Sequence, residues 1–226
     1  MQTARQRSVT ARRRKAEPEG SISLSALRTE AAVCRACPLW RNATRTVFGE
    51  GPASARLMFV GEQPGSAEDL AGRPFVGPAG QVFDKALAEA RIDRQRQFVT
   101  NAVKHFKFER RGKKRIHQRP TADEIAVCRW WLAHEIATVQ PRLIVALGAS
   151  AARAIVGKTV RIGETRGQIL TAEASLGGVP ILVTVHPSYL LRIPDAAQRR
   201  VEFGRFVADL QAAKRHATGA SGSGAH

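Results

Sequence analysis

The run LIVALG (143–148) decides the fold class that this sequence predicts. It is short and apolar at consecutive positions, which is typical of a strand that is covered on both faces of a sheet. Three further apolar runs are LMFVG (57–61), FVTNAV (98–103) and VPILVTV (179–185). Segments with helical periodicity lie between the runs, and strands that alternate with helices indicate an α/β domain. We therefore expect a three-layer α/β/α fold around a central four-stranded, mostly parallel sheet.

The segments around these strands are predicted as helices and irregular stretches. The helices are expected at Ser23–Val33, Gln81–Ile92, Thr121–Gln140, Ser150–Val156 and Asp195–His216. Thr121 and Glu124 have the spacing of a capping box, which marks the start of a helix. The Gly- and Pro-rich stretch 62–80 is expected to be a long loop, and Val160–Thr171 an irregular segment that contains a hairpin-like strand pair.

The stretch KHFKFERRGKKRIHQRP (104–120) is the most unusual part of the chain. It carries eight basic residues and one acid, Glu109, and it shows neither helical nor strand periodicity. Arg111-Gly112 suggests a turn near its middle. A long, irregular, basic loop between regular elements is more often functional than not. The alternative is a solvated loop in which His105 and His117 are incidental.

Polar segments follow each of the four predicted strands. They are Glu62-Gln63-Pro64-Gly65, Asn101 with the basic stretch, Gly148-Ala149-Ser150 and His186-Pro187-Ser188. In a parallel sheet the ligand crevice lies beyond the carboxyl ends of the strands, so these segments should converge at one edge. The basic stretch would then border a binding crevice, which favours a functional role over a solvated loop.

The charge of the chain points to a polyanionic partner. The 226 residues carry a formal net charge of +17, which favours nucleic acid first. Residues 1–20 are rich in arginine and lack apolar periodicity, so we expect a disordered basic tail there. We expect one domain at 21–215 and a second disordered tail at 216–226.

The sequence predicts a cytoplasmic protein. No apolar run approaches transmembrane length, and the basic N-terminus lacks the apolar segment of a signal peptide. Three cysteines, an odd number, do not form the disulfide framework of a secreted protein. We expect an intracellular, nucleoid-associated monomer with no membrane partner.

Three cysteines and one histidine form a candidate metal set. Cys34 and Cys37 form a Cys-x-x-Cys pair, His105 lies at the start of the basic stretch, and Cys128 follows that stretch. Thiolates hold iron–sulfur clusters and an imidazole can replace one of them, while zinc accepts the same ligands. A redox pair, or buried thiols without a metal, is the alternative.

Two stretches have features of base recognition. GEQPGSAEDLAGRPFVGPAG (61–80) supplies the amide of Gln63 and the ring of Phe75, and it has no phosphate-loop signature. A flat exposed ring with amides nearby suits stacking on a base and reading of its edge. In HPSYLLR (186–192), Leu190 and Leu191 can wedge into a duplex where a base leaves the stack. The alternatives are a core phenylalanine and a buried turn.

Taken together, these motifs resemble the uracil-DNA glycosylase superfamily. GEQPG with RPFVGPAG, then TNAVKH, then HPSYLLR occur in the family's order. The early Cys-x-x-Cys and the ligand after TNAVK are similar to the iron–sulfur-containing family-4 type. GEQPG, the histidine after TNAVK and the insert that ends in KRIHQRP resemble the UdgX branch. The resemblance covers residues 24–212.

The resemblance implies a cofactor, a partner and a pocket. The cofactor is a [4Fe-4S] cluster on Cys34, Cys37, His105 and Cys128. The partner is uracil-containing DNA, single-stranded or duplex. In the uracil pocket Phe75 would stack on the base, Asn101 and Gln63 would read its edge, and His186 would bond the uracil O2 as the glycosidic bond breaks.

The resemblance also implies a covalent outcome. Glu62 would sit beside His117, and in UdgX-type proteins the loop histidine attacks the sugar C1′ and stays attached to the DNA after a single turnover. We further expect the DNA to be contacted by Lys113, Lys114, Arg115, Leu190, Leu191 and Arg192. One departure is Ser66, which stands where the family pattern has an acid. The rival functions are a conventional multiple-turnover glycosylase and a non-catalytic iron–sulfur module that binds nucleic acid.

Overall fold

A central sheet of five strands organises the protein. The computed structural model describes residues 22–219. The strand order is β2 (Phe98–Asn101), β1 (Leu57–Gly61), β5 (Leu143–Leu147), β7 (Pro180–Thr184) and β6 (Ile169–Thr171). The first four are parallel, as predicted. The prediction of four strands is wrong by one, because β6 adds to the edge antiparallel to β7.

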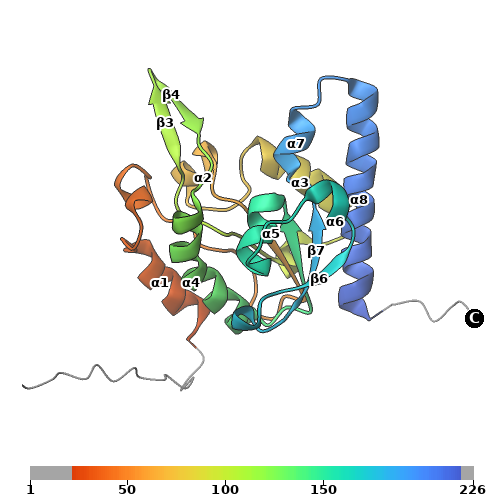
Figure 1. Ribbon diagram of the computed structural model, residues 1–226, viewed down its shortest axis with the longest axis horizontal. Coiled ribbons are helices and arrows are strands. Elements are labelled where there is room, and N and C mark those ends of the chain that lie inside the picture. Colours follow the sequence, from red (N-terminus) through yellow and green to blue (C-terminus); the bar gives the residue numbers. More distant parts are fainter. Residues whose placement is uncertain (1–21, 220–226) are drawn as a thin grey trace, which may run out of the picture.

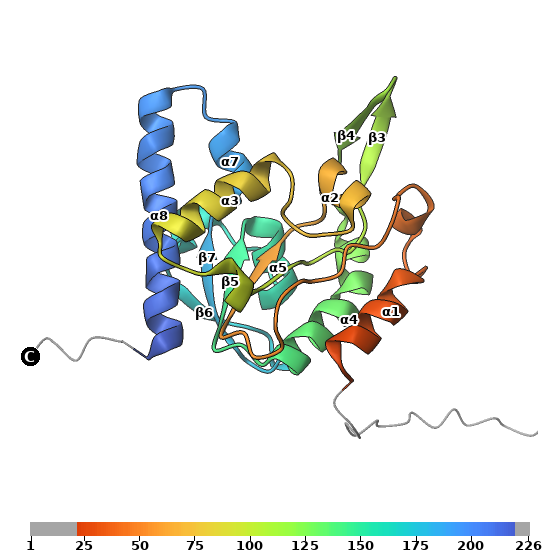
Figure 2. The same ribbon diagram turned by 180° about the vertical axis from the view of Figure 1, so that it is seen from behind.

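Helices cover both faces of this sheet, which confirms the three-layer fold (Figures 1 and 2). Alternate side chains of β5 point to opposite faces, so Ile144 enters one apolar core and Val145 the other. The core of Ile144 includes α1 (Leu24–Ala32), α4 (Ala122–Val139) and α5 (Ala149–Val156). The core of Val145 includes α3 (Pro78–Glu89), α7 (Pro187–Leu191) and α8 (Ala196–Thr218).

The basic stretch is a β-hairpin and not an irregular loop. Strands β3 (Phe108–Arg111) and β4 (Lys114–His117) pair antiparallel, with Phe108 opposite His117. The turn expected at Arg111-Gly112 is present, and Gly112 has a positive φ of 58°. Figure 1 shows the hairpin projecting from the body of the domain. Its side chains are mostly in solvent on both faces, which removes the alternation that identifies a strand.

Other boundaries differ from the prediction in smaller ways. The stretch 62–80 is not all loop, because it contains the short helix α2 (Ser66–Ala71). Val160–Thr171 holds α6 (Ile162–Thr165) and β6, and the strand partner of β6 is β7. Helix α8 continues through Thr218, into the segment predicted as a disordered tail. Short 3-10 helices occur at Pro38–Arg41, Arg94–Arg96 and Ala174–Leu176.

The predicted capping box at Thr121 is confirmed. The Thr121 hydroxyl accepts from the Glu124 amide (3.2 Å), and the Glu124 carboxylate accepts from the Thr121 amide (2.7 Å). The tail predicted at 1–20 lies outside the described residues. Within residues 22–219 no helix is both long enough and apolar enough to cross a membrane.

Candidate active site

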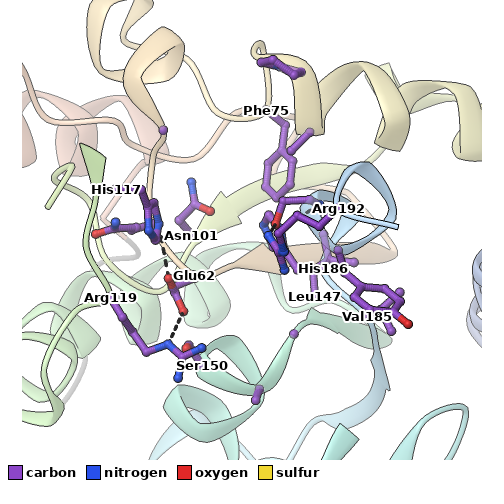
Figure 3. A pocket seen from close by; sticks show the side chains of 18 of the residues that line it. Glu62, Phe75, Asn101, His117, Arg119, Leu147, Ser150, Val185, His186 and Arg192 are labelled. Carbon is purple, nitrogen blue, oxygen red and sulfur yellow. Dashed lines mark hydrogen bonds and ion pairs between the residues drawn. The ribbon is translucent and has the colours of Figure 1, made fainter. Parts of the chain in front are cut away.

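A cleft of about 1390 Å³ lies at the carboxyl edge of the parallel strands. All four polar segments that follow the strands contribute to its wall, as the topology predicts: Glu62, Asn101, Gly148 and His186 all line it. The hairpin adds His117 from one side and α7 adds Tyr189 from the other. Figure 3 shows the side chains of Glu62, Asn101, His117 and His186 around one space.

The floor of the cleft depends on a glycine at the end of β1. A Cβ atom on Gly61 would lie 2.3 Å from Asn101 Oδ1 and 2.7 Å from Phe75 Cζ, so a side chain there would displace both. Gly61 pairs with Asn101 across the two strands, which brings the amide beside the ring. Asn101 is buried, and its Oδ1 has no hydrogen-bond partner among the described residues. A ligand N–H donor would satisfy that oxygen.

Phe75 forms an aromatic wall of the cleft. Its ring lies 5.1 Å from the Phe83 ring and 5.9 Å from the His186 ring, measured between centroids. We expected an exposed aromatic ring, but Phe75 is only 5% exposed. It therefore packs as a core residue on one side and borders the cleft on the other, which is the geometry that a stacking surface needs.

His186 is held as a neutral imidazole. It caps α7, and its Nδ1 accepts from the Ser188 amide (3.2 Å) while the Ser188 hydroxyl lies 2.8 Å from the same nitrogen. Two donors on Nδ1 leave the ring proton on Nε2. Burial, with smaller contributions from the charges of Arg192 and His117, lowers the pKa of His186 to about 4. The ring therefore offers an N–H donor to the cleft without a positive charge.

His117 and Glu62 meet at the opposite side of the cleft. His117 ends β4, and its Nε2 lies 3.4 Å from Glu62 Oε1. Arg119 Nε lies 3.8 Å from the other Glu62 oxygen, as the dashed lines of Figure 3 mark. The His117 side chain is 52% exposed, so an incoming molecule can reach it. Sequence reasoning missed Arg119, whose only local signal is its place two residues after a histidine in a basic stretch.

Gln63 holds the base of the hairpin. Its Nε2 donates to the carbonyls of Lys107 (3.3 Å) and Gln118 (2.9 Å), and its Oε1 accepts from the Lys107 amide (3.1 Å). The amide of Gln63 lines the cleft, but its hydrogen-bonding atoms are engaged with the hairpin. Its role in reading the base stays a prediction. The observed contacts hold the two ends of the hairpin together.

Arg115 also fixes the hairpin to the domain. It forms an ion pair with Asp69 Oδ2 (2.5 Å) and donates to the Ser66 hydroxyl (2.7 Å) and carbonyl (2.9 Å). Asp69 is fully buried, and sequence reasoning did not assign it a role. Ser66, the departure from the family pattern, therefore serves as an acceptor for Arg115. The guanidinium predicted to bind DNA is engaged within the protein.

The other predicted DNA-contacting residues fall into two groups. Lys113, Lys114, Leu191 and Arg192 are exposed, Leu191 to 49% of its surface. Leu190 is only 2% exposed and packs in the core, so the expectation that it forms a surface wedge is wrong. Arg192 donates to the Ser188 hydroxyl (3.0 Å), which links it to the His186 cap.

The predicted metal ligands gather around α4. Cys128 accepts from the Lys104 amide (3.2 Å), next to His105, while Cys34 accepts from Trp131 Nε1 (3.2 Å). Burial raises the pKa of Cys128 to about 12 and also raises the pKa of Cys37. Nevertheless, no three His, Cys, Asp or Glu side chains within residues 22–219 are placed to hold a metal ion.

His105 has the features of an unsatisfied ligand. Its Nε2 lies 2.9 Å from the Thr46 hydroxyl, and its Nδ1 is buried with no hydrogen-bond partner in the described part of the chain. Burial lowers the pKa of His105, which keeps the ring neutral and its free nitrogen available as a donor to a metal. The donor set of three thiols and one imidazole is suited to a soft metal centre.

Comparisons with known proteins identify the family. The family model for the uracil DNA glycosylase superfamily matches residues 48–211. The type-4 uracil-DNA glycosylase of Thermotoga maritima is 40% identical over 182 residues, covering 80% of this chain and 88% of that protein. The type-4 and type-5 enzymes of Pyrobaculum aerophilum are 34% and 31% identical, over 71% and 67% of this chain and 81% and 69% of their own lengths. This chain therefore belongs to the uracil DNA glycosylase superfamily.

Proposed function

We propose that this protein recognises uracil in DNA, cleaves its N-glycosidic bond and remains attached to the sugar C1′ through His117, as UdgX-type members do. The observation that carries the proposal is the pairing of His117 with Glu62, 3.4 Å apart, at the rim of a cleft that also holds Phe75, Asn101 and His186. The names of the relatives support uracil in DNA as the substrate.

The cleft residues can divide base recognition between them. The ring of Phe75 would stack on the base, and the unpaired Asn101 Oδ1 would accept the uracil N3–H. His186 would donate its Nε2 proton to the uracil O2. Cytosine carries no proton at N3, so it would leave the asparagine oxygen unpaired, which discriminates strongly between bases.

The chemical step balances with the residues present. The bond between C1′ and N1 breaks, and its electron pair leaves with the uracil anion, which the neutral His186 donor stabilises. The unprotonated ring nitrogen of His117 forms a bond to C1′, and Glu62 accepts the proton from the other ring nitrogen. An imidazole fixed beside the sugar competes with water at high effective concentration.

We also propose that Cys34, Cys37, His105 and Cys128 hold a [4Fe-4S] cluster. The buried thiols of Cys37 and Cys128, the half-buried thiol of Cys34 and the His105 Nδ1, which is unpaired among the described residues, support this set. When bound, a cluster would cross-link the segment after α1, the segment after β2 and α4, and so stabilise the fold, since metal binding is linked to folding. Iron with acid-labile sulfide in the purified protein is the expected result, and zinc without sulfide would contradict it.

A denaturing gel of the protein with uracil-containing DNA tests the covalent step. Wild-type protein should form a heat-stable complex with one DNA per protein, and should release one uracil for each complex. The variant His117→Ala should form no complex. His134→Ala is the matched control, because His134 lies on α4, outside the cleft lining, and should leave the yield unchanged.

The outcomes of this gel separate the proposal from its rivals. Repeated release of uracil by the wild type without a complex would establish a conventional glycosylase, which the names of the relatives favour. DNA binding without uracil release would establish a non-catalytic module. Peptide mapping that located the attachment at a residue other than His117 would contradict the assigned nucleophile.

A further inference from the structure

Phe75 has a backbone conformation that its residue type avoids. Its φ is +54°, in the left-handed region, where a residue with a bulky side chain is strained. The neighbouring chain is packed closely around it, because a Cβ on Gly80 would lie 2.0 Å from the Phe75 carbonyl oxygen. A strained conformation persists only where surrounding contacts hold it, so some group must fix this carbonyl.

Arg94 is that group. One guanidinium donates to the carbonyls of Pro74 (2.8 Å) and Phe75 (3.2 Å), and it is itself held by Asp84 Oδ1 (2.5 Å). Its carbon Cζ also lies 5.9 Å from the centroid of the Phe83 ring, against which Phe75 packs. Arg94 thus contacts the backbone of Phe75 and the aromatic neighbour of its ring.

Arg94 acts from outside the cleft. It lies in the 3-10 helix Arg94–Arg96, just before β2, and it is not among the residues that line the cleft. Its side chain is 24% exposed, so it does not belong to the apolar core. A planar guanidinium can serve two carbonyls and a carboxylate at once, whereas a lysine ammonium lacks that fixed fork.

We propose that Arg94 is the positioning residue that sets the Phe75 ring as the stacking surface of the pocket. This inference rests on the proposed function, because it assumes that the base stacks on Phe75. Loss of the guanidinium would let the Phe75 backbone relax towards ordinary φ values. The Phe75 ring would then move away from His186. At present the plane of the Phe75 ring makes an angle of 32° with the plane of the imidazole.

The test compares single-turnover kinetics of Arg94→Gln and Arg94→Lys with the wild type. The half-saturating protein concentration on uracil DNA should rise about tenfold in both variants, the scale of one lost charge-assisted hydrogen bond. Affinity for uracil-free DNA should stay unchanged. Arg96→Gln is the matched control, because Arg96 lies in the same turn with an 84% exposed side chain and should behave as the wild type.

A double-mutant cycle with Phe75→Ala isolates the route of the effect. If Arg94 acts through Phe75, then Arg94→Gln should cause no further loss in a Phe75→Ala background. Additive losses, or Arg94 variants that match the wild type, would overturn the inference. A fall in thermal stability with equal losses on uracil-containing and uracil-free DNA would also overturn it. A wild type inactive on uracil DNA would instead contradict the proposed function itself.

Discussion

His186 shows how local contacts fix the chemical state of one side chain. The Ser188 amide and hydroxyl, both on Nδ1, select the tautomer, and burial removes the charge. A neutral donor is suited to a leaving anion because it stabilises the developing charge without a permanent ion pair to the substrate. The same contacts have a consequence for stability, because the unfolded chain does not share them.

Acid should destabilise the fold through His186. Its folded pKa of about 4 lies below the ordinary histidine value of 6.5, so between these values the unfolded chain binds more protons and stability falls as pH falls. Between pH ~7 and pH ~5 the wild type should lose up to about 2 kcal/mol more of its free energy of unfolding than His186→Asn does. Urea titrations of both proteins at the two pH values measure this, and equal losses would contradict it.

Lys104 and Glu135 form an ion pair in the interior. Both side chains are fully buried, 2.7 Å apart. The Lys104 ammonium also donates to the Asn101 carbonyl (2.7 Å), and the Glu135 carboxylate accepts from the Gly49 amide (2.9 Å). The pair therefore links the strand that carries Asn101 to α4, the helix that carries Cys128.

Replacing one member of this ion pair should lower the free energy of unfolding more than replacing both members. Glu135→Gln leaves a buried ammonium without its charge partner and should lower the free energy of unfolding by about 3–5 kcal/mol. Lys104→Met combined with Glu135→Gln also removes the unpaired ammonium, so it should recover part of the lost free energy of unfolding. Urea unfolding of the two variants measures the difference. A double variant less stable than Glu135→Gln would show that the ammonium is not the main cost.

At the scale of elements, the hairpin depends on side chains that lie far from it in sequence. Gln63 bonds its base, and Arg115 reaches back to Asp69 on α2. Without these contacts a two-stranded hairpin is only marginally stable in water. The placement of His117 at the cleft therefore depends on Gln63 as much as on the hairpin itself.

Replacing Gln63 should slow formation of the covalent adduct without slowing the release of uracil. In Gln63→Leu the three contacts to the hairpin base are lost, so adduct formation should slow about tenfold while uracil release continues and water takes the sugar. Gln118→Leu is the control, because within the described part of the chain the Gln118 side chain bonds only Glu109, on the hairpin surface. The measured quantity is the ratio of adduct to hydrolysed product. An unchanged ratio with altered base selectivity would support base reading by Gln63 instead.

The sequence predicted the elements that have a burial pattern and missed those that lack one. The parallel strands are continuous apolar runs, and Thr121 with Glu124 marks a helix start, so both were predictable. Strand β3 is largely exposed and carries no such pattern. A strand was expected in the segment that holds the largely exposed β6, but as part of a local pair and not beside β7. The convergence of Glu62, Asn101 and His186 followed from topology alone. The contacts of Gln63 did not, because they join residues 44 and 55 positions apart.

At the scale of the molecule, charge should govern how fast DNA is captured. The net charge of +17 predicts that the rate of complex formation falls steeply as salt rises, while a complex already formed resists salt. Lys113→Ser with Lys114→Ser should reduce the slope of the logarithm of the rate against the logarithm of salt concentration by up to about 2. Lys158→Ser, just beyond the far end of α5, should leave it unchanged. Gel time courses at several salt concentrations measure these slopes.

The chain leaves the domain and re-enters it at nearly one point to form the hairpin. The Gln118 amide donates to the Lys107 carbonyl at 3.0 Å, so the two ends of residues 108–117 are already side by side. We therefore expect that residues 108–117 can be excised and the ends rejoined without shifting the sheet, provided that Asp69, which loses its Arg115 partner, is replaced as well. The proposed base pocket belongs to the domain body, and the proposed nucleophile, His117, belongs to the hairpin. A single-turnover protein that stays attached to DNA and a multiple-turnover glycosylase would therefore differ by the presence or absence of this hairpin on the same domain.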